Sequence, residues 1–382
     1  MFKKNKFFVL AFAAAIFLTL FFVVTQIPSA NPVPKNIPIA VVNLDQGKMG
    51  KTIFSKITGA KKSTNENTPT VDWTYKKDED SARKGMNQQE YYATIVVPKN
   101  FTKDIAGVLQ NKSDGTQLKI VINQGVNPTL AGSVSTLLTT MVGKINGEVQ
   151  AQMFKQLAIA QVKLPAETSA KMMNIVTEKT ETVHSTKHLM TASSGFFQPI
   201  WIASLVSALM LFYAGKGREF KSRKHLAWFK LGQVSVAALL AITMGFLTTV
   251  YSEWILGYNL PTPVTVGWFL SIAGFAFIML ILGFVSWLGV PGVAIFGILL
   301  FFSAPLMQLA PQMIPHFYRV WVTPWLPMRF LFDGSRGILY YGQHLWNNSV
   351  SGLLIVMSVG LVVIFSEIFS PRRTFVNGEL DD

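Results

Sequence analysis

Residues 266–288 read VGWFLSIAGFAFIMLILGFVSWL and contain no Asp, Glu, Lys or Arg. They belong to a run from 254 to 318 that also lacks these residues. That run is too long for one span, because a helix needs about 20 apolar residues to cross roughly 30 Å of hydrocarbon. Glycine and proline interrupt it at 289–292 (GVPG) and favour a turn. The stretch therefore predicts a hairpin of two membrane-spanning helices, at about 266–288 and 293–310.

The composition of the whole chain also indicates a membrane protein. Half of the 382 residues are hydrophobic and only 14% are charged, whereas about 25% are charged in a typical soluble domain. Further apolar runs complete a predicted bundle of six transmembrane helices, with the remaining spans at about 7–27, 196–215, 231–251 and 349–368.

The first of these spans has a second interpretation, because lysines followed by an apolar run are typical of a cleaved signal peptide. Its apolar run of about 20 residues is longer than the 7–15 of such peptides. Pro28 also lies where cleavage requires a small residue. We therefore expect an uncleaved membrane anchor.

Basic residues near the ends of the spans predict the orientation. They cluster in residues 1–6, in the loop 216–230 and in the tail 371–382. Short cytoplasmic loops carry an excess of Lys and Arg, and six spans place all three clusters on one side. We therefore expect a multi-pass protein of the cell (plasma) membrane with both termini in the cytoplasm and residues 28–195 outside it.

The prediction divides the chain into four parts. Residues 1–30 form the N-terminal tail and first transmembrane helix, and 31–195 form an extracytoplasmic α/β domain with long helices, inserted between the first two spans. Residues 196–370 form a five-helix transmembrane domain, and 371–382 form a cytoplasmic tail. The net charge of +14 reflects orientation and not nucleic-acid binding, because the outer domain has alternating charges and no basic stripe with interleaved aromatics.

The outer domain alternates strands with helices, as in a small α/β layer with crossover connections. We expect strands at 37–43, 70–75, 91–97 and 117–123, with helices between them at about 50–57, 78–88 and 101–110.

Two longer helices are expected to follow. In the first, apolar residues recur at three- and four-residue steps and form one stripe. The stripe consists of Leu130, Val134, Leu137, Met141, Ile145 and Val149. The second is expected over about 166–189. We interpret the stripe as core or helix-pair packing; the alternative is a protruding helical hairpin that contacts a partner.

Residues 45–52 (DQGKMGKT) are similar to a phosphate-binding loop, but Asp45 occupies the position that requires glycine. Its carboxylate would face the phosphates, and the segment is predicted to lie away from the ATP pool. We expect no nucleotide binding, and instead a turn into a helix that Asp45 and Gly47 shape.

Candidate catalytic and metal sites are weak, so we expect neither an enzyme nor a cofactor. The chain has no Cys, which excludes thiolate metal sites and cysteine nucleophiles. His184 and His188 would share a face of the expected helix, and Glu181 is the best third ligand. We interpret them as solvated helix residues and expect no metal.

Residues 311–345 combine dense prolines with aromatic side chains. Prolines forbid a plain span and aromatic residues favour the membrane interface, so we expect a re-entrant or interfacial segment. Asp333 lies four residues after Arg329 and three before Arg336, so one helical face can pair them. A structural ion pair is the simpler interpretation; the alternative is a polar element that contacts a transported substrate.

Several stretches resemble known membrane families. Residues 41–47 (VVNLDQG), which include Asn43, Asp45 and Gly47, resemble the opening of the YhgE/Pip (phage infection protein) family. Residues 91–101 (YYATIVVPKNF) resemble that ectodomain and those of type-2 ABC exporter permeases. In addition, 198–201 (QPIW) looks like a segment of the related fungal nitrosoguanidine-resistance membrane proteins.

The resemblance implies an exporter-like fold in the cell membrane, with one span, an ectodomain and then five spans. It suggests a homodimer that moves an amphipathic or lipid-like compound, with energy from a separate cytoplasmic ATPase or an ion gradient. Type-2 permeases have an amphipathic helix before the first span, whereas six residues precede Phe7 here, which weakens the expectation of an ATPase. A short coupling helix in the loop 216–230 would still serve one, through Arg218, Lys221, Arg223 and Lys224.

A second hypothesis comes from a different functional class. The chain would be a non-transporting envelope receptor or scaffold, like a phage infection protein, that acts through its ectodomain. Copurification of an ATPase through the loop 216–230 would favour the exporter. Full activity of the ectodomain without the five later spans would favour the receptor.

Overall fold

The computed structural model describes residues 13, 15–17, 19–20, 23–30, 32–59, 68–161 and 164–370. It divides into two compact units, one of residues Val33–Thr186 and one of residues Met1–Pro32 with Lys187–Asp382. We describe each unit by itself.

The unit Val33–Thr186 contains a five-stranded sheet with the order β2-β1-β3-β4-β5. Neighbouring strands are parallel except for β3 and β4, which are antiparallel. The strands are β1 (Ile37–Asn43), β2 (Val71–Lys76), β3 (Ala93–Val97), β4 (Thr116–Asn123) and β5 (Val176–Val183). The first four match the strands predicted from the sequence.

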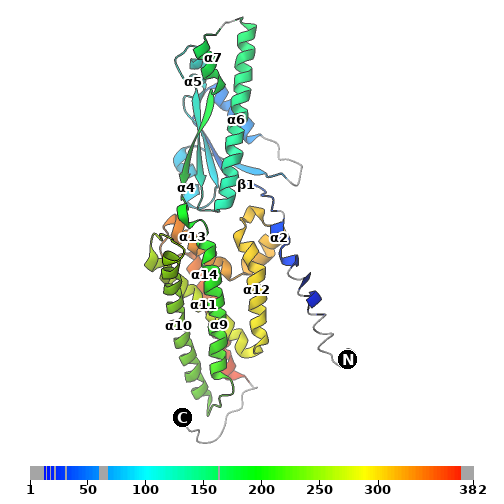
Figure 1. Ribbon diagram of the computed structural model, residues 1–382, viewed down its shortest axis with the longest axis vertical. Coiled ribbons are helices and arrows are strands. Elements are labelled where there is room, and N and C mark those ends of the chain that lie inside the picture. The colour runs from blue at the N-terminus through cyan, green and yellow to red at the C-terminus, as the bar shows by residue number, and fades with distance from the viewer. Residues whose placement is uncertain are drawn as a thin grey trace. The chain divides into compact units, whose positions relative to one another are not determined.

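Helices cover both faces of this sheet. The helices are α3 (Lys48–Thr58), α4 (Glu79–Asn87), α5 (Phe101–Val108), α6 (Pro128–Ile159) and α7 (Ala166–Met173). On one face α4 packs Ala82 and Met86 against Ala40, Val42 and Val96. Alternate strand residues point to the opposite face, which α3, α5 and α6 contact. Figure 1 shows α6 running along the sheet.

The predicted helix over 166–189 is wrong. Only its first turns form a helix, α7, and β5 follows. The segment 176–183 reads VTEKTETV, in which β-branched residues favour a strand, and β5 gains a full parallel ladder with β4. Consequently His184 and His188 do not share a helical face: His184 follows β5 with a φ of +46°.

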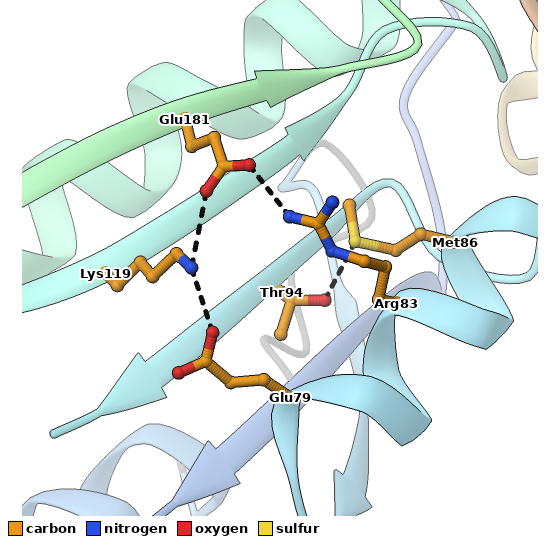
Figure 2. Close-up of polar contacts among 6 residues, drawn as sticks. All are labelled: Glu79, Arg83, Met86, Thr94, Lys119 and Glu181. Carbon is orange, nitrogen blue, oxygen red and sulfur yellow. Dashed lines mark hydrogen bonds and ion pairs between the residues drawn. The ribbon is translucent and has the colours of Figure 1, made fainter. Parts of the chain in front are cut away.

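An alternating charge network joins the edge strand β5 to α4 (Figure 2). Lys119 Nζ on β4 lies 2.9 Å from Glu79 Oε2 and 3.3 Å from Glu181 Oε2. Arg83 of α4 donates a hydrogen bond of 2.8 Å to Glu181 Oε1. These charges also protect an exposed strand edge against pairing with other chains.

The second unit is a helical bundle, and among its described residues five helices are long and apolar enough to cross a membrane. The helices that form these spans are α9 (Phe197–Gly215), α10 (Arg223–Trp254), α11 (Pro263–Leu288), α12 (Pro291–Gln308) and α14 (Asn348–Ser366). They coincide with five of the six predicted spans. About half of the predicted first span, 7–27, lies outside the described residues; α2 (Ile27–Ala30) is the short helix at its end.

The predicted hairpin is present. Gly289 ends α11 with a φ of +70°, and Pro291 begins α12. A positive φ suits glycine, and proline suits the first turn of a helix, where its missing N–H is not needed.

The helix α11 is the centre of the bundle, since it contacts α9, α10, α12 and α14. Glycines let two neighbours approach closely. A Cβ on Gly245 of α10 would lie 2.3 Å from Ser271 Oγ, and one on Gly360 of α14 would lie 2.4 Å from the carbonyl carbon of Met279. Small residues at helix contacts are a common device for packing helices in membranes.

The segment 311–345 forms short helices instead of a span. It comprises the 3-10 helix η3 (Pro311–Met313), the π-helix η4 (Tyr318–Val322), the 3-10 helix η5 (Thr323–Trp325) and α13 (Met328–Tyr341). Buried Leu331, Phe332 and Ile338 anchor α13 in the bundle core. A re-entrant or interfacial position in the membrane stays a prediction.

Candidate functional site

The predicted polar cluster lies on α13, and its three residues are paired there. Arg329 Nε is 3.9 Å from Asp333 Oδ2, and Arg336 pairs with Asp333 Oδ1. The Asp333 side chain is 44% exposed and that of Arg336 is 19% exposed. The pairing predicted from the spacing is therefore present. A half-exposed cluster of this kind is compatible with both the structural and the substrate-contact interpretation.

A second ion pair is more deeply buried, and sequence reasoning missed it. Lys230 Nζ on α10 lies 2.5 Å from Glu367 Oε2, and each side chain is 5% exposed. Glu367 begins the short helix η6 (Glu367–Phe369) directly after α14. Lys230 Nζ also lies 3.5 Å from Ser286 Oγ of α11. The pair thus joins three helical segments inside one bundle.

Lys230 and Glu367 are the only buried charged residues among the described part of this unit. Each lies near one end of a membrane-length apolar segment, Lys230 in Arg223–Trp254 and Glu367 in Asn348–Phe369. Transferring charges out of water is costly even when they are paired. Ionisable side chains inside membrane helices are for this reason rare and typically mark substrate or ion pathways.

The pair borders a cavity of about 180 Å³. The polar lining comes from Lys216, Lys230, Gln233, Ser286 and Glu367, and phenylalanines close much of the rest. Gln233 donates a hydrogen bond of 2.6 Å to the Leu211 carbonyl, but its buried Oε1 has no hydrogen-bond partner among the described residues. A water molecule occupies about 30 Å³ of liquid, so the cavity has room for several waters or a small polar group beside the charges.

A larger cavity of about 470 Å³ lies elsewhere in the bundle, between α2, α9 and α12. Its lining mixes Gln26, Gln198 and Gln308 with apolar residues such as Ile202 and Phe301. This mixture of amide and hydrocarbon surface suits a molecule with both a polar and an apolar part.

The loop 216–230 does not form the expected coupling helix. Ser222 accepts a hydrogen bond from the His225 N–H and caps α10, so residues 223–230 are the first turns of that long helix. Cations at a helix N-terminus oppose the helix dipole, so the basic residues at the start of α10 do not stabilise this helix. All four predicted cations are exposed and make no ion pair with a described residue: Arg218, Lys221, Arg223 and Lys224.

Comparison with known proteins identifies the family. The model of a family described as "Protein of unknown function (DUF3533)" matches residues 7–350. The chain belongs to the DUF3533 family. No curated protein and no solved structure matches it.

In this DUF3533 protein the segment similar to a phosphate-binding loop is a structural turn. Asp45 Oδ2 accepts hydrogen bonds from the Gly47 N–H at 3.0 Å and from the Thr102 hydroxyl at 2.6 Å. Asp45 Oδ1 accepts another from the Thr102 N–H at 3.2 Å, and Asn43 Oδ1 accepts one from the Asp45 N–H at 3.0 Å.

Glycine is required twice around this carboxylate. A Cβ on Gly47 would lie 2.2 Å from Thr102 Oγ1, and one on Gly50 would lie 2.4 Å from Asp45 Oδ2. The motif residues Asn43, Asp45 and Gly47 therefore connect β1 to α3 and to the start of α5. This agrees with the turn predicted from the sequence.

The described residues contain no group of three or more His, Asp or Glu side chains arranged to hold a metal ion. His184 is partly buried, and its Nδ1 lies 3.0 Å from Asn123 Oδ1. Burial and the positive charge of Arg83 lower the pKa of His184 below its ordinary value, which favours the neutral ring.

Proposed function

We propose that this DUF3533 protein is the membrane subunit of an exporter, with a type-2 ABC permease-like arrangement, and that it moves an amphipathic or lipid-like compound across the cell membrane. In this proposal six spans, including 7–27, hold both termini in the cytoplasm and residues 28–195 outside. The similarity to YhgE/Pip proteins noted in the sequence is part of the proposal.

The buried Lys230–Glu367 pair beside a cavity is the observation that carries the proposal. A receptor or scaffold that acts through an outer domain has no need of buried charges between membrane helices. A transporter uses such groups in its substrate or ion path. The cavity lined by Gln26, Gln198 and Gln308 supports an amphipathic cargo, because it offers both hydrogen-bonding and apolar surface.

The energy source in this proposal is external to the chain. Residues 45–47 form a turn that the Asp45 carboxylate fills, and α3 begins at Lys48. This supports a proposal in which the segment does not bind ATP. A separate cytoplasmic ATPase or an ion gradient supplies the energy, and the permease-like plan implies a homodimer.

Export is tested with cells that contain or lack the protein, loaded with a fluorescent long-chain amphiphile. We expect lower accumulation and faster efflux in cells that contain the protein. Equal accumulation, with the protein present in the membrane at normal abundance, would contradict export and favour the receptor or scaffold.

A further inference from the structure

A wide groove lies within the unit Val33–Thr186, apart from the bundle features used above. It has a volume of about 1,240 Å³ and runs between α3, α6 and the edge strand β2. This is larger than the roughly 300–1,000 Å³ of ordinary small-molecule pockets, so the groove can accommodate an extended ligand.

The floor of the groove is apolar. The residues that form it are Ile57, Val71, Trp73, Leu137, Met141 and Ile145. Leu137 and Met141 belong to the stripe on α6 that the sequence analysis assigned to packing, yet both are only half-buried. The rest of the stripe is buried (Leu130, Val134, Ile145 and Val149), and Leu138 and Val142 are buried beside it. Leu137 and Met141 are thus available to a ligand.

The rim of the groove is positively charged. It carries Lys51, Lys56 and Lys144 with Glu148 as the single acid, a net charge of +2. Lys56 pairs with Glu148 across the groove from α3 to α6. Lys51 and Lys144 are exposed and form no ion pair with a described residue. The hydroxyl of Ser55 adds a hydrogen-bond donor on the same rim.

From this arrangement we propose that the groove binds a single-chain amphipathic anion, with its hydrocarbon chain on the Trp73 and Met141 floor and its carboxylate or phosphate head near Lys51 and Lys144. The apolar floor favours burial of the hydrocarbon chain, and the two lysines favour an anionic head group over a neutral one. This proposal deepens the proposed function, because it gives the exported compound a chemical class. Binding in the groove does not depend on export, and only the transport of the bound compound rests on the proposed function.

Binding is measured on the full chain in lipid nanodiscs. Because the chain has no Cys, Ser133→Cys on the groove rim can carry an environment-sensitive dye without side reactions. Lys112→Cys, which is exposed and does not line the groove, carries the same dye as the control position. The probes are myristate, a lysophosphatidic acid with the same chain, and the neutral monomyristoylglycerol, each below its micelle concentration.

We expect a saturable signal at the Ser133 position with both anions and none at the Lys112 position. The double variant Lys51→Gln/Lys144→Gln should weaken anion binding about 3- to 10-fold, as expected for two exposed charge contacts, and leave binding of the neutral probe unchanged. A preference for one anion identifies the head group as carboxylate or phosphate.

Three results would overturn the proposal: no saturable signal, equal signals at both dye positions, or equal affinity for the neutral probe and the anions. Met141→Glu, which places a carboxylate on the floor, must also abolish anion binding while Met190→Glu, outside the groove, does not. Binding is measured without transport, so the two proposals can fail separately. A negative export test in cells does not contradict binding in the groove, and a negative binding test does not contradict export.

Discussion

At the scale of residues, the carboxylate of Asp45 accepts hydrogen bonds from Gly47 and twice from Thr102 while it is itself 5% exposed. Asp45→Ala leaves these donors unsatisfied. We expect a loss of about 1–3 kcal/mol in the free energy of unfolding of the unit Val33–Thr186. It is measured by chemical denaturation of the purified protein, with tryptophan fluorescence as the signal. Asp72→Ala, an exposed residue on β2, is the matched control. Equal stabilities of the two variants would refute the role of Asp45.

The charge network in Figure 2 predicts a pH dependence. Hydrogen bonds from Arg83 and then Lys119 lower the pKa of Glu181 below its usual 4.5. A lowered pKa in the folded state adds stability that is present above about pH 4.5 and is lost as the pH falls through the lower folded value. The gain is at most about 1 kcal/mol, because the pair is partly exposed and screened.

Glu181→Gln removes this contribution. Thermal melts at pH 7 and pH 3 should therefore show a smaller drop in melting temperature for the variant than for the native protein. Identical drops would show that the network does not couple to folding. Lys119 behaves in the opposite sense: its pKa is raised, first by Glu79, so its contribution is lost as the pH rises above about 10.5.

At the scale of elements, close packing of α14 on α11 depends on Gly360, whose added Cβ would meet the backbone of Met279 at 2.4 Å. Backbone cannot move aside as a flexible side chain does. Gly360→Ala should cost about 1–3 kcal/mol by overpacking and lower the amount of folded protein in membranes. Gly297→Ala on α12, where a Cβ meets nothing within 4 Å, should have normal abundance. Equal abundance of both variants would contradict this packing.

The elements that the sequence predicts well are those with a local signal. An uncharged run of about 20 residues is enough to identify a span, and the GVPG turn identifies the hairpin of α11 and α12. The strand β5 was missed because its residues are mostly polar and show no clear apolar alternation. Its β-branched residues favour a strand, and its pairing with β4 stabilises one. Likewise, a stripe of period 3.6 does not separate core residues from Leu137 and Met141 at the edge of a groove.

At the scale of the whole molecule, the candidate site could not be predicted because it joins distant parts of the chain. In the sequence, Lys230 is one of several basic residues in the loop 216–230 that indicate orientation in the membrane. Glu367 lies just past the last apolar run. Nothing local shows that these two side chains meet. The pairing of Arg329, Asp333 and Arg336, in contrast, followed from spacing on one helix.

The orientation of the molecule is a separate prediction at this scale. A Cys introduced at Ser222 should resist an impermeant thiol reagent in intact cells, because the basic loop is expected in the cytoplasm. A Cys at Ser113 should react. Labelling at Ser222, or none at Ser113 after the protein is shown to be at the surface, would contradict the proposed topology.

In the proposed exporter the buried Lys230–Glu367 pair serves transport and not only folding. Lys230→Met or Glu367→Leu alone leaves one buried charge without its partner, which costs about 3–5 kcal/mol, so either variant should lose membrane abundance. Replacing both residues by apolar ones is often neutral or stabilising.

The decisive measurement is therefore export by the double variant Lys230→Met/Glu367→Leu, normalised to its amount in the membrane. We expect the abundance of the double variant to return to the native level while efflux of the amphiphile remains at the level of cells without the protein. Native efflux by the double variant would contradict it, because the pair would then be a structural contact alone.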